Sequence, residues 1–309
     1  MERQLRRKSK KTIKIILVTI FLLIAGVVTY GFSVYKNLNN AANKVHSPID
    51  RSPEVERTSE LSLKKKDPFS VLILGIDADE GEKGRSDSMI LITVNPEKMS
   101  MDMLSIPRDT RVEIVGKGID DKINHAYAFG DVEMSMNTVE KFLDIPVDYY
   151  MKMDMTGFKD IVDAIGGVDV NNDYEFSVGK NHFPVGQISM NGEEALDFVR
   201  MRKQDPRGDF GRQMRQRLVI QGALNKAANL STLWKYTDIL DALSKNVETN
   251  ISFDEMKEMQ KNYGDARQHI EQFQIEGTGA MIDGIWYYIV SEEERTKIQT
   301  GLKEHMGLM

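Results

Sequence analysis

Apolar residues between positions 71 and 111 come in three short runs that are separated by charged clusters. The runs are Val71–Leu74, Met89–Val94 and Met101–Ile106, each rich in branched aliphatic or methionine side chains. Runs of this length bounded by polar loops predict strands of a buried sheet. Helical patterns and extended segments then alternate up to residue 170, which predicts an α/β fold, a three-layer α/β/α sandwich with a central mixed β-sheet.

The second half of the chain continues this pattern after one interruption. Residues 172–190 are polar and contain Gly179, Pro184 and Gly186, which indicates a small hairpin or a loop over the site. A helix over 195–201 and a longer one from 211 or 212 to about 230 follow. Ser-x-x-Glu sequences at Ser252 and Ser291 predict two further helix starts, and 285–290 is expected to be a strand. We expect one catalytic domain over 67–309, with its motifs within 67–230.

The N-terminus predicts a membrane anchor. The first 14 residues carry seven basic residues and one acidic residue, and residues 15–32 carry no charge. We therefore expect a cytoplasmic tail over 1–14, a transmembrane helix over 15–32 and an extracellular stalk over 33–66. We thus expect a single-pass type II protein of the cell membrane with an extracellular catalytic domain. A signal peptide cleaved near residues 40–42 is the alternative.

Composition excludes several classes of site and partner. The chain has no cysteine and five scattered histidines, so disulfides, thiol catalysis and zinc sites are not expected. Removing the +6 of the first 14 residues from the net charge of −6 leaves −12 for the rest. An acidic exported domain argues against nucleic acid as a partner.

Charged residues gather at the predicted strand ends. Asp77 ends the first strand, Arg85 and Asp87 begin the second, and Arg108 and Arg111 follow the third. Two carboxylates brought together favour a hard cation such as Mg²⁺, and neighbouring guanidinium groups favour phosphate. The alternative is a set of surface ion pairs around a loop.

A second basic segment supports the anion site. Residues 200–217 hold six arginines in an otherwise acidic domain. Arg200 and Arg202 are two residues apart, while Arg212 and Gln216 are one helical turn apart near the start of the long helix, where free N–H groups also favour an anion. A solvated basic helix end is the alternative.

The ordered set of motifs resembles the LytR-CpsA-Psr family over residues 67–230. The motifs are Gly75-Ile-Asp77, Arg85-Ser-Asp87-Ser, Ser105-Ile-Pro-Arg-Asp109, Lys122-Ile-Asn-His-Ala-Tyr127, Gly166-Gly-Val-Asp169, Asn191-Gly-x-x-Ala195-Leu, and Arg200-x-Arg202 with Asp209-x-x-Arg212-x-x-x-Gln216. The resemblance implies a phosphotransferase that moves a glycopolymer, with wall teichoic acid as the first candidate, from a polyprenyl diphosphate donor to the N-acetylmuramic acid of peptidoglycan.

The resemblance also implies roles for single residues. Asp77 and Asp87 would hold Mg²⁺, with Mn²⁺ as the alternative ion. The diphosphate would be bound by Arg85, Arg108, Lys122, Arg200, Arg202, Arg212 and Gln216. Arg85, Arg108 and Asp209 are the catalytic candidates. Asp109 and Asp209 are candidate general bases, and His125 is expected to be structural.

Two other functions stay open at this point. A polyprenyl-diphosphate phosphohydrolase would use water as the acceptor at the same site. A non-catalytic lipid-intermediate binder that regulates wall metabolism would need a damaged site, and every mapped polar position is intact. The family fold also implies an apolar tunnel for the lipid, whose lining the sequence does not identify.

Overall fold

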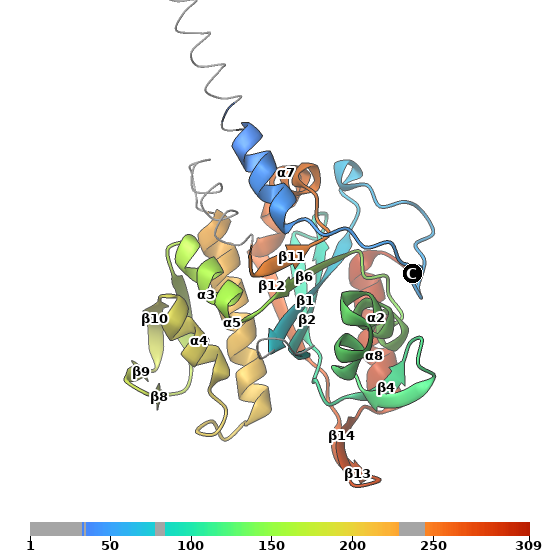
Figure 1. Ribbon diagram of the computed structural model, residues 1–309, viewed down its shortest axis with the longest axis vertical. Helices are drawn as coiled ribbons and strands as arrows, with labels where there is room; N and C mark the ends of the chain where they lie inside the picture. The colour runs from blue at the N-terminus through green and yellow to red at the C-terminus, as the bar shows by residue number, and fades with distance from the viewer. Residues whose placement is uncertain (1–32, 34, 78–83, 229–244) are drawn as a thin grey trace, which may run out of the picture.

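A six-stranded mixed sheet forms the centre of the fold (Figure 1). The computed structural model describes residues 33, 35–77, 84–228 and 245–309. The strand order is β11-β6-β1-β2-β3-β12. The strands are β1 (Phe69–Asp77), β2 (Arg85–Asn95), β3 (Ser100–Ser105), β6 (Tyr149–Met153), β11 (Val247–Thr249) and β12 (His269–Gln274). β1, β2 and β3 are antiparallel, whereas β6 is parallel to β1 and β12 to β3. The predicted α/β fold with a central mixed sheet is confirmed.

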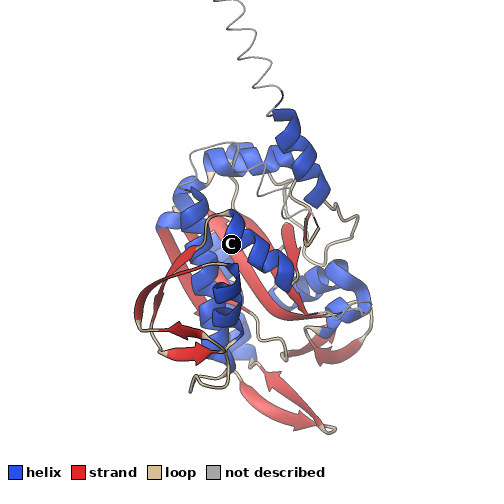
Figure 2. Ribbon diagram, turned by 60° about the vertical axis from the view of Figure 1, so that its left-hand side comes forward, coloured by secondary structure: helices blue, strands red, loops and turns tan. Residues whose placement is uncertain are grey.

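Helices cover both faces of this sheet, as Figure 2 also shows. They are α2 (His125–Leu143), α8 (Glu292–Met306), α5 (Asp209–Ala228) and α7 (Phe253–Asn262). In β1, Leu72 and Leu74 pack into the core with α2 and α8, while Val71 and Ile73 face the core that contains residues of α5 and α7. Because neighbouring strand residues point to opposite faces, a fully apolar run is what a sheet covered on both sides requires.

A smaller layer extends the sandwich on the α5 side. It contains α3 (Met155–Ala164), β7 (Val168–Asn172), β8 (Phe176–Val178), β9 (Asn181–Phe183), β10 (Gly186–Met190) and α4 (Gly192–Arg200). Residues 172–190 do form a hairpin, β8–β9, followed by β10 paired with β7. The aromatic side chains of Phe176 and Phe183 pack with Phe198 of α4. The hairpin therefore closes its own apolar cluster, and of the two predicted alternatives the small hairpin is confirmed.

The remaining elements are short. They are η1 (Leu63–Lys65), β4 (Arg111–Ile114), β5 (Ile119–Lys122), η2 (Gly264–Gln268), β13 (Thr278–Ile282) and β14 (Ile285–Ile289). The predicted helix starts are confirmed, since Ser252 and Ser291 each accept a hydrogen bond from the backbone N–H three residues later. α2 consists of two helical segments, which are separated by non-helical backbone at Gly130 and Asp131.

Residues 46–66, predicted as the second half of a stalk, contact the folded body. Arg51 forms an ion pair with the fully buried Glu140 at 2.8 Å, and Arg57 pairs with Asp148 at 2.5 Å. A helix over 35–45 precedes this segment and packs Tyr35 against Phe253 of α7, with ring centroids 5.7 Å apart. These long-range pairs explain why composition alone placed the start of the folded body too late.

The predicted tail over 1–14 and membrane anchor over 15–32 lie outside the described residues. Among the helices in the described ranges, none is both long and apolar enough to cross a membrane.

Candidate functional site

The site begins where β1 ends and β2 starts. Asp77 pairs with Arg85 across the two strands, and the register shifts between Gly75 and Ile76. The shift occurs where a Cβ on Gly75 would lie only 3.1 Å from the Cβ of Ser88. This irregularity turns the polar ends of both strands toward one rim of the sheet.

A polar cavity of about 430 Å³ lies at this rim. It is lined by Asp77, Gly84, Arg85, Asp87, Arg108, Asp109, Lys122, Asn124 and His125. Six of the predicted site residues thus meet in one cavity, from the β1 and β2 ends, the turn after β3 and the end of β5. The sequence separates these segments by up to 45 positions, and the antiparallel pairing of β1, β2 and β3 brings them together.

Arg108 is held at the cavity wall by two carboxylates. Its guanidinium lies 2.8 Å from Asp87 and 3.7 Å from Asp109. Burial by itself would lower the pKa of Arg108, but Asp87, Asp109 and Asp209 together outweigh it and the net shift of this pKa is upward. The turn that carries Arg108 is fixed by hydrogen bonds from Thr110 to the carbonyl of Pro107. Arg108 is therefore a fixed cation with part of its surface, 26%, still accessible.

Lys122 adds a second positioned cation. Its Nζ donates to Asp109 at 2.7 Å. Asp109 therefore lies between Arg108 and Lys122 and sets the position of both. Its role in the structure is that of a shared counter-ion.

The start of α5 supplies the second group of predicted residues. Asp209 Oδ1 lies 2.7 Å from Arg212 and 3.9 Å from Arg202. Gln216, one turn further along α5, accepts a hydrogen bond from Ser88 of β2 at 3.1 Å. The α5 residues therefore approach the same rim from the other side of the sheet.

Electrostatic coupling connects the two groups. Burial lowers the pKa of Arg212; Asp209 opposes the shift, and the positive charge of Arg108 lowers the pKa further. Asp209 in turn raises the pKa of Arg108. Arg212 Nε is buried and has no hydrogen-bond partner within the described part of the chain. A cluster of cations with an unused buried donor is suited to bind an anion.

Not every predicted residue joins this cluster by contact. Arg200, at the end of α4, is exposed, and the described ranges contain no hydrogen bond or ion pair from its side chain. Its predicted role in diphosphate binding therefore remains a prediction.

The arginine-rich segment serves the fold as well as the site. Arg215 is 1% exposed and binds Asp205 at 2.5 Å and the carbonyl of Phe198 at 3.0 Å. Arg217 is buried and donates to Ser105 at 2.5 Å. Of the six arginines between 200 and 217, these two are structural, and Arg207, which pairs with Asp173 and Asp205, supports the same network.

Two cavity residues were not predicted as ligands. Asn124 precedes α2, and its Oδ1 is buried without a hydrogen-bond partner among the described residues. His125, expected to be structural, pairs with Asp121 at 2.8 Å and also lines the cavity. Both belong to the Lys-Ile-Asn-His motif, so the motif was the sequence feature that could have identified them as cavity residues.

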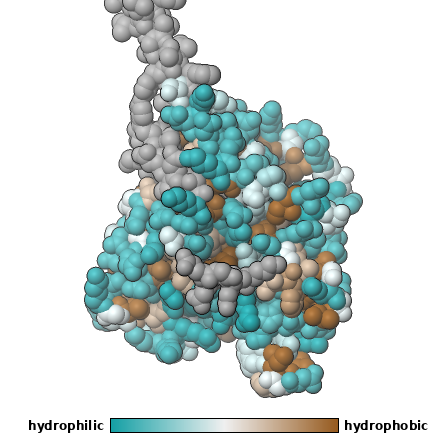
Figure 3. All heavy atoms as spheres, viewed as in Figure 1, coloured by the Kyte–Doolittle hydropathy of each residue, from teal (hydrophilic) through white to brown (hydrophobic). Residues whose placement is uncertain are grey.

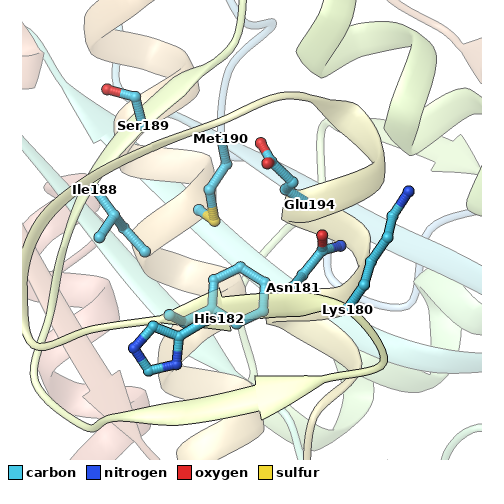
Figure 4. Close-up of a pocket in the computed structure, with 8 residues that line it drawn as sticks. Lys180, Asn181, His182, Ile188, Ser189, Met190 and Glu194 are labelled. Carbon is cyan, nitrogen blue, oxygen red and sulfur yellow. The ribbon is translucent and has the colours of Figure 1, made fainter.

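A second cavity, of about 370 Å³, lies between β9, β10 and α4 (Figure 4). Two of its polar groups already have partners: Asn181 donates to Asp197 at 2.8 Å and Ser189 donates to Asp169 at 2.5 Å. It contains none of the predicted site residues. We therefore assign the chemistry to the cavity at the rim of the sheet.

The carboxylates of the rim are compatible with a magnesium ion. Asp77 and Asp87 line the same cavity, and both offer oxygen ligands. No group of three or more metal-ligating side chains occurs within the residues that the structure describes. Two carboxylates fit Mg²⁺ because this ion is commonly held by one or two carboxylates together with substrate phosphates.

Comparison with known proteins gives consistent matches over nearly the whole chain. The model of the LytR_cpsA_psr family matches residues 32–304. The polyisoprenyl-teichoic acid–peptidoglycan teichoic acid transferase TagU of Bacillus cereus is 52% identical over 298 residues, covering 96% of this chain and 98% of the relative.

Two solved structures share the fold. The crystal structure of B. subtilis TagU matches with a TM-score of 0.66 at 49% identity, over 78% of this chain and 97% of that one. The LytR-CPS2A-psr family protein YwtF (TagT) with bound octaprenyl pyrophosphate lipid matches with a TM-score of 0.69 at 30% identity, over 85% of this chain and 100% of that one. This chain belongs to the LytR-CpsA-Psr family.

Proposed function

We propose that this protein is a phosphotransferase that moves teichoic acid from a polyprenyl diphosphate carrier to peptidoglycan. Relatives about half identical over nearly the full chain carry the name of this transferase. A structure with the same fold holds a polyprenyl pyrophosphate lipid.

The observation that carries the proposal is the convergence of cations at the rim of the sheet. Arg85, Arg108 and Lys122 line one cavity, and Arg212 is electrostatically coupled to Arg108. A diphosphate carries several negative charges within a few ångströms, and guanidinium groups bind its oxygens in pairs.

The proposed reaction exchanges one P–O bond for another. The C6 hydroxyl oxygen of N-acetylmuramic acid bonds to the phosphorus nearer the glycan, and the bond from that phosphorus to the bridging oxygen breaks. Polyprenyl phosphate leaves with the bonding electrons, and the hydroxyl proton passes to a base. The product is a phosphodiester between teichoic acid and peptidoglycan.

The side chains of the rim bind and orient rather than form covalent bonds. Arg108 and Lys122, both held by Asp109, are positioned to bind phosphate oxygens without reorganising. Fixed cations of this kind stabilise charge that develops on the leaving phosphate. Asp209 holds Arg212 in the same way.

Neither candidate base is free of counter-ions. Asp109 contacts Lys122 and Asp209 contacts Arg212, both at 2.7 Å. Each carboxylate therefore already serves as the counter-ion of a cation that is proposed to bind phosphate. We therefore assign positioning roles to both, and the acceptor of the proton is not assigned.

Asp77 and Asp87 would hold Mg²⁺, or Mn²⁺ in its place, at this site. The ion would neutralise charge on the diphosphate. The remaining parts of the proposal are the single-pass anchor over residues 15–32 and a catalytic domain outside the membrane, which the composition of the N-terminus supports.

The test uses the full chain in detergent with a radiolabelled polyprenyl-diphosphate-linked teichoic acid precursor, peptidoglycan oligomers and Mg²⁺. We expect label to appear on peptidoglycan and to be lost with Arg108→Ala. Arg267→Ala is the matched control and should transfer normally, since within the described part of the chain this arginine bonds to the nearby carbonyl of Gly264.

Two other results would each indicate a different function. Release of free glycan phosphate without transfer would indicate the phosphohydrolase. Binding of the lipid with no turnover for any acceptor would indicate the non-catalytic binder.

A further inference from the structure

The hairpin of β13 and β14 projects from the body beside the candidate site. Apolar side chains gather at its tip (Figure 3), where Met281, Ile285 and Trp286 are 64%, 47% and 45% exposed. Residues 277–290 contain one charged residue, Asp283. Exposed apolar side chains on a projecting element are costly unless they meet a partner.

The root of this hairpin is joined to the catalytic rim. The backbone N–H of Tyr288 donates to the carbonyl of Asp109 at 2.9 Å, and Tyr287 Oη donates to Asp121 at 3.4 Å. The ring of Tyr288 also lies edge-on to Phe210, 5.9 Å away, and Phe210 follows Asp209 at the start of α5. The hairpin is thus continuous with both residue groups of the site.

One face of the hairpin carries two aromatic side chains. Trp286 and Tyr288 are two residues apart on β14, so they share a face, and their ring centroids are 6.5 Å apart with planes tilted by 35°. A row of three rings, Trp286, Tyr288 and Phe210, therefore leads from the exposed part of the hairpin toward Asp209.

Two glycines on β13 and just before it leave room for these rings. A Cβ on Gly279 would lie 2.9 Å from Nε1 of Trp286, and one on Gly277 would lie 2.7 Å from Cε1 of Tyr288. Any side chain at these positions would force the rings away from the strand. The indole consequently lies across the hairpin with one side exposed to solvent, where it can contact a ligand.

We propose that the exposed indole of Trp286, which is backed by the buried ring of Tyr288, binds the glycan strand of the peptidoglycan acceptor. Pyranose rings have apolar C–H faces that stack on aromatic rings, and a sugar stacked on Trp286 would align the neutral glycan chain with the rim where its hydroxyl reacts. This assignment rests on the proposed transfer function and names its acceptor subsite.

Charge and position favour this occupant over others. Teichoic acid is a polyanion, and residues 277–290 hold no lysine or arginine to bind it. A membrane surface is disfavoured because the hairpin lies at the opposite end of the molecule from the helix over 35–45, which leads to the predicted anchor (Figure 1). A strand of alternating neutral sugar rings meets neither objection.

The test measures cosedimentation of the full chain in detergent with peptidoglycan sacculi that have been stripped of teichoic acid. We expect the half-saturating sacculus concentration to rise about tenfold for Trp286→Ala, which corresponds to the loss of one stacking contact. Trp286→Phe should stay within about twofold of wild type because it keeps a ring. Phe273→Ala removes a comparably exposed aromatic side chain from a different strand, β12, and this variant should bind normally.

Several results would overturn the assignment. These are unchanged binding by Trp286→Ala, no binding of sacculi by the wild type, and equal competition by purified teichoic acid chains. A parallel loss of vesicle binding, lipid diphosphate binding or self-association in Trp286→Ala would point to a different occupant. Thermal unfolding of each variant shows whether the fold is intact.

The two proposals fail in different ways. If the wild type binds sacculi through Trp286 but never consumes the donor, the transfer function is wrong and the glycan surface stands. If transfer proceeds and Trp286→Ala leaves the acceptor KM unchanged, the surface is wrong and the function stands.

Discussion

Two arginine clusters from neighbouring parts of the chain have opposite designs. At the rim, Arg108 is 26% exposed, and Arg212 keeps a buried Nε without a hydrogen-bond partner in the described residues. In the second cluster, Arg215 is 1% exposed, and Asp205 and backbone carbonyls use its donors. The comparison teaches that a cation prepared for a ligand retains unused hydrogen-bonding capacity, whereas a structural cation does not.

The rim should therefore lose activity and not stability when a cation is removed. Arg108→Ala is expected to reduce transfer by about 10³-fold, as for other losses of a positioned charge-stabilising donor, because it removes the guanidinium that lies beside Asp87. Initial rates of labelled transfer measure this, and thermal unfolding serves as the control. If Arg108→Ala instead unfolds at a much lower temperature and keeps a normal kcat, Arg108 is a structural cation like Arg215.

The buried cluster should behave in the opposite way. Arg215→Ala leaves the carboxylate of Asp205 buried with fewer partners, and we expect a loss of about 3–5 kcal/mol in the free energy of unfolding. Arg207 still contacts Asp205, which favours the lower end of that range. Urea titration of the full chain in detergent measures the change. Stability equal to wild type would show that the network contributes nothing.

The buried pair His305 and Asp102 extends the comparison, because burial shifts the pKa of each residue toward its uncharged form. Burial lowers the pKa of His305 to about 4, and burial raises the pKa of the neighbouring Asp102 to about 6. His305 binds fewer protons in the folded than in the unfolded state, so its contribution to stability is present above about pH 6.5 and is lost as pH falls toward 4. Asp102 binds more protons when folded, so its contribution grows as pH falls from about 6.

These opposite signs give a paired prediction. On acidification from pH 7 to 4.5, Asp102→Asn should lose more stability than wild type and His305→Gln should lose less, each by about 2 kcal/mol. Urea unfolding at the two pH values measures both. Shifts of the same sign in both variants would contradict the assignment of opposite proton linkage.

The smallest expected change concerns the carboxylates of the rim. Asp77→Asn removes a charge from the proposed ion site and should weaken binding of Mn²⁺, used as a spectroscopic probe, by at least about tenfold, or ~1.4 kcal/mol. Electron paramagnetic resonance of free Mn²⁺ reads this without any turnover. Asp254→Asn, a substitution on exposed α7, is the control. Equal Mn²⁺ binding in Asp77→Asn would remove Asp77 from the site.

Much of the rim could be predicted from the sequence because its residues sit at strand ends. Asp77, Arg85, Asp87 and Arg108 border apolar runs, and a buried sheet places such ends along one rim. Lys122 and Asp209 required the family resemblance, since neither borders a run that predicts the location. Asn124 and His125 were not identified as cavity residues, because a motif does not state which of its side chains point inward.

The sequence by itself determined the α/β class, the carboxylate and arginine composition of the site, and the family. These follow from periodicity and from an ordered set of local motifs. Only the tertiary structure decided which arginines are structural, that residues 46–66 contact the body through Arg51 and Arg57, and that the β13–β14 hairpin stands beside the rim. The physical reason is that burial and pairing depend on partners far away in the chain, such as Glu140 for Arg51, and no local pattern records them.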